Sequence, residues 1–157
     1  MKQISLTQGH FAVVDDDDFK TLSVFKWYAA KTTKAGDFYA VRGIRRRGTY
    51  QNVRMHRVIM SAKTGEVVDH RNHNTLDNRK DNLRLVTNSQ NAMNRKGANI
   101  NSRTGIRGVY FDNVEKKFRA TIRVDGRQKS IGRFRTIKAA AIAWDKAKND
   151  FYGEYGG

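Results

Sequence analysis

The chain has 157 residues, with 31 Lys and Arg against 15 Asp and Glu, four His, and neither Cys nor Pro. This length allows one domain or two small ones and excludes a large multidomain enzyme. Without Cys, a disulfide framework and a nuclease built around a Cys-ligated structural zinc are excluded. No run approaches the roughly 18 apolar residues of a membrane span, and the first residues lack the apolar core of a signal peptide. We therefore expect a cytoplasmic protein with no membrane partner.

The formal net charge of +16 predicts a polyanionic partner, most often nucleic acid. Hydrophobic residues make up 38% of the chain and aromatic residues 10%, which favours a folded protein over a disordered one. Basic residues exceed acidic ones by about two to one in each of the segments 1–55, 56–96 and 97–157. A basic tail on a neutral domain is thereby excluded, and we expect several segments to contact the same polyanion. The alternative is a basic domain that is merely soluble.

Residues 1–55 are expected to be rich in β-structure. Apolar runs and turn residues predict strands at 10–14, 27–30 and 38–42, a turn at 34–37 and a short helix at 19–25. Four consecutive aspartates, Asp15 to Asp18, stand between the first strand and the helix. We interpret them as an exposed turn and helix cap, with a metal cluster as the alternative.

The middle of the chain reads as strand, loop, strand and helix. The expected elements are a short helix at 55–60, a strand at 67–70, a loop rich in Asn and Asp at 71–82, a strand at 83–86 and a helix at 91–95. Thr87 and Gln90 form a capping box, which predicts the start of that last helix.

After a linker, the chain predicts a three-stranded sheet followed by one helix. The expected elements are strands at 108–111, 118–123 and 129–132, a turn at Asp125-Gly126, and a helix from Ile137 to Tyr152 with Thr136 as its cap and Gly153 as its end. The apolar stripe of this helix includes Trp144 and Phe151, which we expect to pack on the sheet.

Four polar residues of the middle segment suggest phosphodiester hydrolysis: Asp69, His70, Asn82 and Asn91. Hydrolysis needs a base that activates water, and His70 titrates near neutrality. Asp69 and Asn91 offer hard oxygen ligands suited to Mg²⁺ rather than zinc. Neighbouring strand residues normally point to opposite faces, so Asp69 and His70 can converge only where the strand twists or ends. The alternative is that Asp69 and His70 form a structural hydrogen-bonded pair.

The motifs Asp69-His70, Leu76 to Arg84 and Ser89-Gln90-Asn91 resemble the HNH endonucleases, more narrowly their phage and intron-associated homing-type branch. There the last His of the motif is often Asn, as at Asn91. The resemblance implies a ββα-metal fold with His70 as general base, Asp69 and Asn91 as ligands of one divalent cation, and Asn82 as a structural residue of the loop. That cation would be Mg²⁺, with Mn²⁺ as the alternative and no structural zinc.

The remaining histidines are not expected to be ligands. We expect His56 and His73 to lie at the surface or beside the site, and His10 to have no catalytic role. His73 stands where the HNH family commonly has Gly in a tight turn, and His tolerates a positive φ less well than Gly.

The C-terminal segment from Arg103 carries a second resemblance. Strand alternation directs Phe118, Ala120 and Ile122 to one face and Arg119, Thr121 and Arg123 to the other. The motifs Arg107-Gly108-Val109-Tyr110, 117–123, 131–136 and 139–145 resemble the APETALA2-type DNA-binding domain. The resemblance implies DNA contacts by Arg107, Tyr110, Arg119, Thr121, Arg123, Gln128 and Ser130. The alternative is a solvated sheet face.

The sequence thus predicts an α+β protein: an HNH module with a β-rich N-terminal part, followed by a three-stranded antiparallel sheet packed on one helix. The expected boundaries are 1–55 for the β-rich part, 56–96 for the ββα-metal core, 97–102 for a linker and 103–157 for the DNA-binding domain. The expected function is a monomeric, divalent-metal-dependent endonuclease that acts on duplex DNA, without a small-molecule substrate, in a phage-infected or bacterial cell. The alternatives are a catalytically inactive DNA-binding regulator and an RNA-binding protein.

Overall fold

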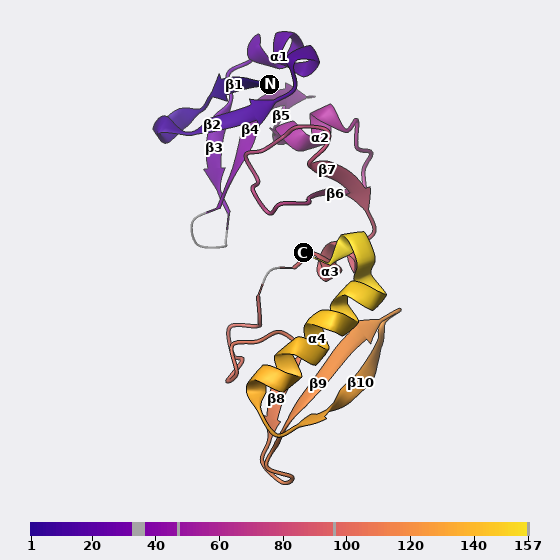
Figure 1. Ribbon diagram of the computed structural model, residues 1–157. Coiled ribbons are helices and arrows are strands. Elements are labelled where there is room, and N and C mark those ends of the chain that lie inside the picture. The colour runs from indigo at the N-terminus through magenta and orange to yellow at the C-terminus, as the bar shows by residue number, and fades with distance from the viewer. Residues whose placement is uncertain (33–36, 47, 96, 157) are drawn as a thin grey trace. The chain divides into compact units, whose positions relative to one another are not determined.

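A computed structural model describes residues 1–32, 37–46, 48–95 and 97–156 as a mixed α/β protein with four small antiparallel sheets (Figure 1). Its contacts divide the chain into two compact units, Met1–Thr87 and Asn88–Gly157. The finer boundaries expected from the sequence stay a prediction. Within the described ranges, no helix has the length and apolarity needed to cross a membrane.

The first unit contains three antiparallel sheets and two short helices. Its elements in chain order are β1 (Lys2–Ser5), the 3₁₀ turn η1 (Thr7–Gly9), β2 (Phe11–Val14), α1 (Asp16–Ser23), β3 (Tyr28–Lys31), β4 (Phe38–Arg46), β5 (Thr49–Arg54), α2 (Met55–Ile59), β6 (Val67–His70) and β7 (Leu83–Val86). β1 pairs with β2, β3–β4–β5 form one sheet, and β6 pairs with β7. Strands β1 and β5 were not predicted, and of the turn expected at 34–37 only Asp37 lies within the described residues.

The core of the first unit joins the β1–β2 and β3–β4–β5 sheets to both helices. Its buried side chains are Ile4, Ala12, Val14, Leu22, Trp27, Ala40 and Met55. Trp27 also donates a hydrogen bond from its indole N–H to the carbonyl of Leu22, at 2.8 Å, which fixes the end of α1. Burial of such apolar surface is the main favourable term in folding.

The four aspartates, Asp15 to Asp18, begin helix α1 and also contact the 71–82 loop. Asp16, Asp17 and Asp18 lie in the first turn of α1, where the helix dipole favours negative charge. The carboxylate of Asp15 accepts a hydrogen bond from the backbone N–H of Lys80 at 2.8 Å, and Asp18 pairs with the Lys80 ammonium at 3.0 Å. These contacts with Lys80 therefore hold the 71–82 loop against the start of α1. Among the described residues, no group of three or more His, Cys, Asp or Glu is arranged to hold a metal.

The second unit packs one long helix on a three-stranded sheet. Its elements are α3 (Asn88–Met93), β8 (Val109–Asp112), β9 (Lys117–Val124), β10 (Arg127–Phe134), α4 (Ile137–Tyr152) and the 3₁₀ turn η2 (Gly153–Tyr155). The strand order is β10-β9-β8, and α4 lies along one face of the sheet (Figure 1). Asp125 and Gly126 have φ values of 50° and 74°, as the predicted tight turn requires. The Thr136 hydroxyl accepts the N–H of Ala139 at 3.2 Å and so caps α4.

The interior of this unit corrects one expected contact. Val109, Ala120, Ala140 and Trp144 form a buried cluster, as the apolar stripe of the helix predicted. Phe151, however, is 47% exposed, and Tyr152 is buried instead with Ile122 and Ala147. The Tyr152 hydroxyl donates to the carbonyl of Arg123 at 2.9 Å, so the polar end of this ring is satisfied where an apolar residue was expected.

Candidate active site and nucleic-acid-binding surfaces

Asp69 and His70 are the last two residues of strand β6. In the β6–β7 ladder, Asp69 lies opposite Arg84 and His70 lies opposite Leu83. Both polar side chains are buried, with exposed fractions of 8% and 5%. The pair therefore lies at a strand end, which is where the sequence required it to lie for the two side chains to act at one site.

Arg84 is the partner of Asp69 that sequence reasoning missed. Its Nε and Nη2 atoms donate to Asp69 Oδ2 at 2.9 and 2.8 Å, and both side chains are buried. Because a buried carboxylate is costly without a counter-charge, Arg84 compensates the charge of Asp69 and holds the carboxylate in one orientation. The signal was available, since the predicted hairpin places Arg84 directly across from Asp69.

His70 is enclosed by aromatic rings and by the 71–82 loop. The His56 ring meets it edge-on at 5.0 Å between centroids, and the Tyr39 ring lies at 6.1 Å. Burial lowers the pKa of His70, while the nearby Asn78 side chain and the charges of Asp69 and Asp77 act in the opposite direction. Burial has the largest effect, so His70 is neutral near pH 7 and is able to accept a proton.

His56 lies beside the site, which is one of the two positions expected for it. Its side chain is 4% exposed and contacts the rings of Tyr39 and His70. Burial, together with His70, Arg54 and Arg57, lowers the pKa of His56 to about 3. His56 is therefore a neutral ring in the wall behind His70. Its burial arises from distant packing and could not be read from a short helical segment.

Asn82 connects the two ends of the 71–82 loop. Its Oδ1 accepts the N–H of Asn72 at 3.0 Å, and its Nδ2 donates to the carbonyl of Asp77 at 2.7 Å. The Asp77 carboxylate in turn accepts hydrogen bonds from Asn72 and Arg79, and the bond from Arg79 has the largest effect in lowering the pKa of Asp77. His73 adopts a φ of 63°, the left-handed conformation expected at the tight turn. These contacts make the loop a rigid cover next to His70.

Asn91 lies on α3, an element of the second unit, and its side chain is exposed. Of the four residues singled out by the sequence, the first unit thus contains Asp69, His70 and Asn82, and the second contains Asn91.

Three of the residues expected to contact DNA form a network across the sheet of the second unit. The Gln128 side chain donates to Tyr110 Oη at 2.8 Å and to Thr121 Oγ1 at 3.0 Å, and these two oxygens are also hydrogen-bonded to each other. Thr121 is buried, whereas Tyr110 is 39% exposed. The other members of the set on this sheet are exposed: Arg119, Arg123 and Ser130.

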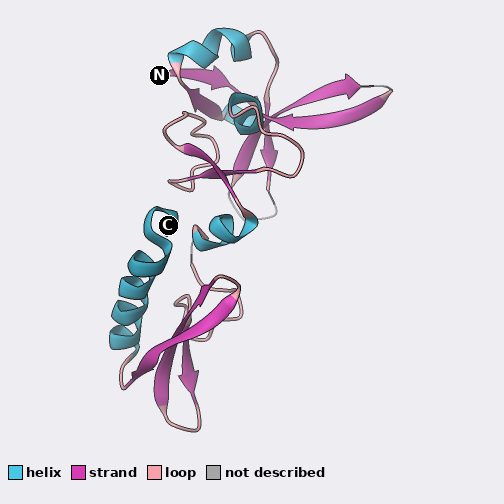
Figure 2. Ribbon diagram, turned by 90° about the vertical axis from the view of Figure 1, so that its right-hand side faces the viewer, coloured by secondary structure: helices cyan, strands magenta, loops and turns pink. Residues whose placement is uncertain are grey.

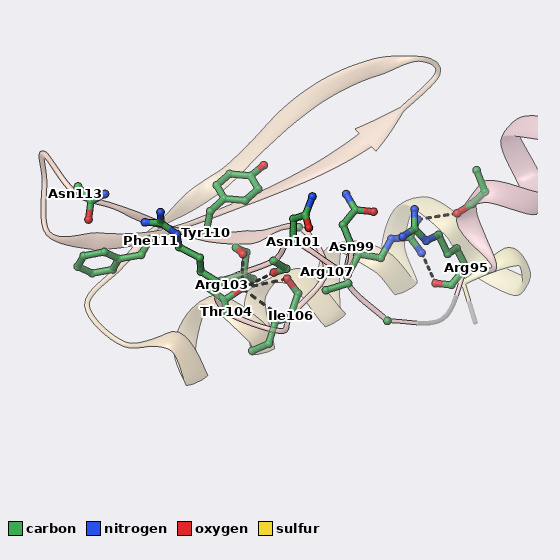
Figure 3. A pocket seen from close by; sticks show the side chains of 16 residues that line it. Arg95, Asn99, Asn101, Arg103, Thr104, Ile106, Arg107, Tyr110, Phe111 and Asn113 are labelled. Carbon is green, nitrogen blue, oxygen red and sulfur yellow. Dashed lines mark hydrogen bonds between the residues drawn. The ribbon is translucent and has the colours of Figure 1, made fainter. Parts of the chain in front are cut away.

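Arg107 differs from the other residues expected to contact DNA, because its guanidinium forms hydrogen bonds within the second unit. It donates to the carbonyls of Ala92, Met93 and Arg95 at 2.7, 2.9 and 2.7 Å. Burial lowers the pKa of Arg107, and its guanidinium carbon lies 5.6 Å from the Trp144 ring centroid. Figure 3 shows Arg107 beside Arg95, at the wall of a cavity of about 560 Å³ that Asn101, Arg103 and Tyr110 also line.

A second basic surface, which the sequence did not single out, lies on the β4–β5 hairpin. Residues 42–54 contain five Arg and no acidic residue. The hairpin projects from the rest of the first unit (Figure 2), and Arg45, Arg46 and Tyr50 are exposed on it. A two-stranded ribbon of this kind fits the major groove of duplex DNA.

The first unit therefore places a buried His next to a buried Asp that is paired with Arg84, at the end of a hairpin. Residues 53–93 match the family model described as HNH endonuclease. The chain is also 27% identical over 154 residues to an uncharacterised HNH endonuclease of Acanthamoeba polyphaga mimivirus, covering 94% of this chain and 74% of the relative. No solved structure matches the chain.

Proposed function

We propose that the protein is a divalent-metal-dependent HNH endonuclease that hydrolyses phosphodiester bonds of duplex DNA. The observation that carries the proposal is the buried Asp69-His70 pair at the end of β6, within the residues that match the HNH family. Products with a 3′-hydroxyl and a 5′-phosphate are expected. A monomer with one such site nicks one strand per binding event.

In the proposed reaction His70 accepts a proton from the attacking water. Its neutral state, caused by burial, suits a general base. The Tyr39 and His56 rings restrict the orientation of the imidazole. Pre-orientation of this kind reduces the entropy lost on reaching the transition state.

We infer a single hard cation such as Mg²⁺ from the chemistry of the candidate donor residues alone. The donor set is one carboxylate, Asp69, together with the amide oxygen of Asn91, and Mg²⁺ sites use one or two protein ligands plus water and phosphate oxygens. Arg84 binds Oδ2 of Asp69 and so orients the carboxylate. When bound, the cation stabilises negative charge on the phosphate and on the leaving oxygen. Mn²⁺ is the alternative ion.

DNA binding is proposed to use both units. In the first, the exposed Arg45 and Arg46 of the β4–β5 hairpin support contact with a groove or with backbone phosphates. In the second, we propose an APETALA2-type sheet that meets DNA through Tyr110, Arg119, Thr121, Arg123, Gln128 and Ser130. The exposed Arg119 and Arg123 on one face, with α4 on the other, support this assignment. For Arg107, the internal hydrogen bonds favour a structural role over a DNA contact.

Cleavage of supercoiled plasmid tests the proposal. With Mg²⁺ or Mn²⁺ the protein is expected to produce nicked circles, and EDTA is expected to abolish the reaction. His70→Gln should reduce the rate by about 10²- to 10⁴-fold, as for loss of a general base, while His10→Gln serves as the matched control. Equal rates for both variants would exclude His70 as the base. Tight plasmid binding without cleavage at any metal concentration would instead favour the inactive regulator.

A further inference from the structure

The cavity in Figure 3 lies beside the first strand of the sheet in the second unit and has a volume of about 560 Å³. β8 is an edge strand, and residues 104–106 cover its free side where the strand begins. The Thr104 hydroxyl donates to the carbonyl of Val109 at 2.6 Å, and the Val109 N–H donates to the carbonyl of Ile106 at 3.3 Å. Binding sites for small molecules occupy roughly 300–1,000 Å³. The cavity is thus of the size that admits one nucleotide but not a double helix.

The charged side chains at this cavity are all positive. Of the described residues that line it, three are Arg and none is Asp or Glu. Arg95 and Arg103 are exposed, whereas the guanidinium of Arg107 is taken up by backbone carbonyls. Figure 3 shows Arg95 and Arg107 at one end of the cavity and Arg103 towards the other. This charge favours an anionic ligand, and the planar guanidinium of arginine suits a phosphate group.

Phe111 adds an aromatic surface at the same end of the cavity as Arg103 (Figure 3). Its ring is 42% exposed and is held in place by the ring of Phe118, at 5.1 Å between centroids. The exposed side chains of Asn101 and Asn113 also line the cavity, and a carboxamide can both donate to and accept from the edge of a base. Proteins that bind single-stranded nucleic acid combine cations along the backbone with aromatic rings that stack on the bases. The cavity offers both.

We propose that this cavity binds an unpaired nucleotide of a DNA strand: Phe111 stacks on its base, and Arg95 and Arg103 contact the phosphates beside it. The site is separate from the sheet face proposed to meet duplex DNA, because Arg119 and Arg123 do not line the cavity. A nucleotide enters such a cavity only after leaving the base stack, and this costs least where the base is mismatched or already unpaired. The protein should therefore prefer DNA that contains an unpaired base. The inference goes beyond the proposed function and requires neither cleavage nor a metal.

Fluorescence anisotropy of the full-length protein in EDTA tests the proposal with two labelled probes, a DNA duplex and the same duplex with one unpaired thymine. The wild type should bind the second about tenfold more tightly, as expected when one base stacks on an aromatic ring. Phe111→Leu keeps an apolar side chain against Phe118 but has no ring, so it should bind both probes equally. Phe151→Leu removes a similarly exposed ring from α4 and should keep the wild-type preference. Equal affinity of the wild type for both probes would overturn the proposal, and so would a wild-type preference in Phe111→Leu.

Arg103→Gln tests the phosphate contact, and it replaces Phe111→Leu if that variant does not fold. The slope of log K against log salt should fall by about 0.7–0.9 for the duplex with the unpaired thymine, as for loss of one phosphate contact, and stay unchanged for the intact duplex. Lys146→Gln removes one charge from the exposed side of α4 and should not change the difference between the two probes. An equal fall for both probes in Arg103→Gln would overturn the proposal and assign Arg103 to ordinary duplex binding.

Two further measurements identify what enters the cavity. Permanganate attacks the C5–C6 double bond of a thymine that is not stacked, so the wild type should protect the unpaired thymine and Phe111→Leu should leave it reactive. Free dTMP in large excess should displace the labelled strand only weakly, because it lacks the flanking phosphates that the arginines contact. If dTMP competes as well as the strand does, the cavity is a site for a free nucleotide and the proposal is overturned.

Discussion

The β6–β7 hairpin and the β8–β10 sheet both carry arginines on antiparallel strands, and they use them in opposite ways. In the hairpin, Arg84 is buried and donates two hydrogen bonds to Asp69. In the sheet, Arg119 and Arg123 are exposed. A buried arginine maintains the charge and orientation of a neighbouring group, whereas an exposed arginine is available to a partner from solution. The same residue type therefore supports the candidate active site in one unit and lies on a candidate binding surface in the other.

The largest expected effect comes from breaking the buried pair. Arg84→Met leaves the Asp69 carboxylate buried without its counter-charge, which should lower the free energy of unfolding of the first unit by about 3–5 kcal/mol. Arg119→Met, at an exposed position, should change stability by less than about 0.5 kcal/mol. The chain has two Trp, Trp27 in the first unit and Trp144 in the second, so ¹⁹F NMR of fluorotryptophan-labelled protein in urea follows each unit separately.

A double variant controls for simple loss of packing. Arg84→Met combined with Asp69→Leu removes both charges together and should be less destabilising than Arg84→Met alone. If the two variants are equally unstable, the contribution of Arg84 is packing and not charge compensation.

The second effect is a dependence of stability on pH that is stronger in the first unit than in the second. The pKa of His56 falls from about 6.5 in the unfolded chain to about 3 in the fold. Between these values the unfolded state binds more protons, so stability rises with pH, by at most about 1.4 kcal/mol per pH unit for this group. Below pH 6.5 the resonance of Trp27 should therefore report progressively easier unfolding, and this should be greater than for Trp144.

His56→Gln identifies the group responsible. The variant cannot take up a proton at this position, so its stability should fall less steeply between pH 6.5 and about 3. His10→Gln is the matched control, and its stability should follow the wild-type pH dependence. A wild-type slope in His56→Gln would assign the acid sensitivity to another group.

The elements that could be predicted from the sequence are those with local signals. Asp125-Gly126 marked a hairpin turn and Thr136 marked a helix cap, and the structure has both. Strand β5 could not be found in this way, because nearly all its residues are exposed and it shows no apolar alternation. A strand at 38–42, the first half of β4, was predicted, but the pairing of β4 with β5 and the projection of the hairpin are not local properties.

In the candidate site too, the features with local sequence signals were predicted and those that depend on distant residues were not. Asp69 and His70 were found from residue type and spacing, and their position at a strand end agrees with that reasoning. The burial of His56 and the three carbonyl contacts of Arg107 depend on side chains distant in sequence. For Arg107, the resemblance of its local motif implied a DNA contact. In the structure its guanidinium instead binds the end of α3, which tertiary packing brings next to it.

The smallest expected effect is on DNA affinity, and it tests the exposed arginines of the β8–β10 sheet. Arg119→Gln and Arg123→Gln should each leave stability unchanged and reduce the slope of log K against log salt for duplex DNA by about 0.9, if each contacts one phosphate. If an arginine instead reads a base, the slope stays constant and discrimination between sequences falls by about 1–3 kcal/mol. Titration of the full-length protein at several salt concentrations, with Lys146→Gln as control, distinguishes the two. If the variants keep both the wild-type salt slope and the wild-type discrimination between sequences, this sheet face is only solvated. The basic hairpin of the first unit would then have to supply the DNA contacts.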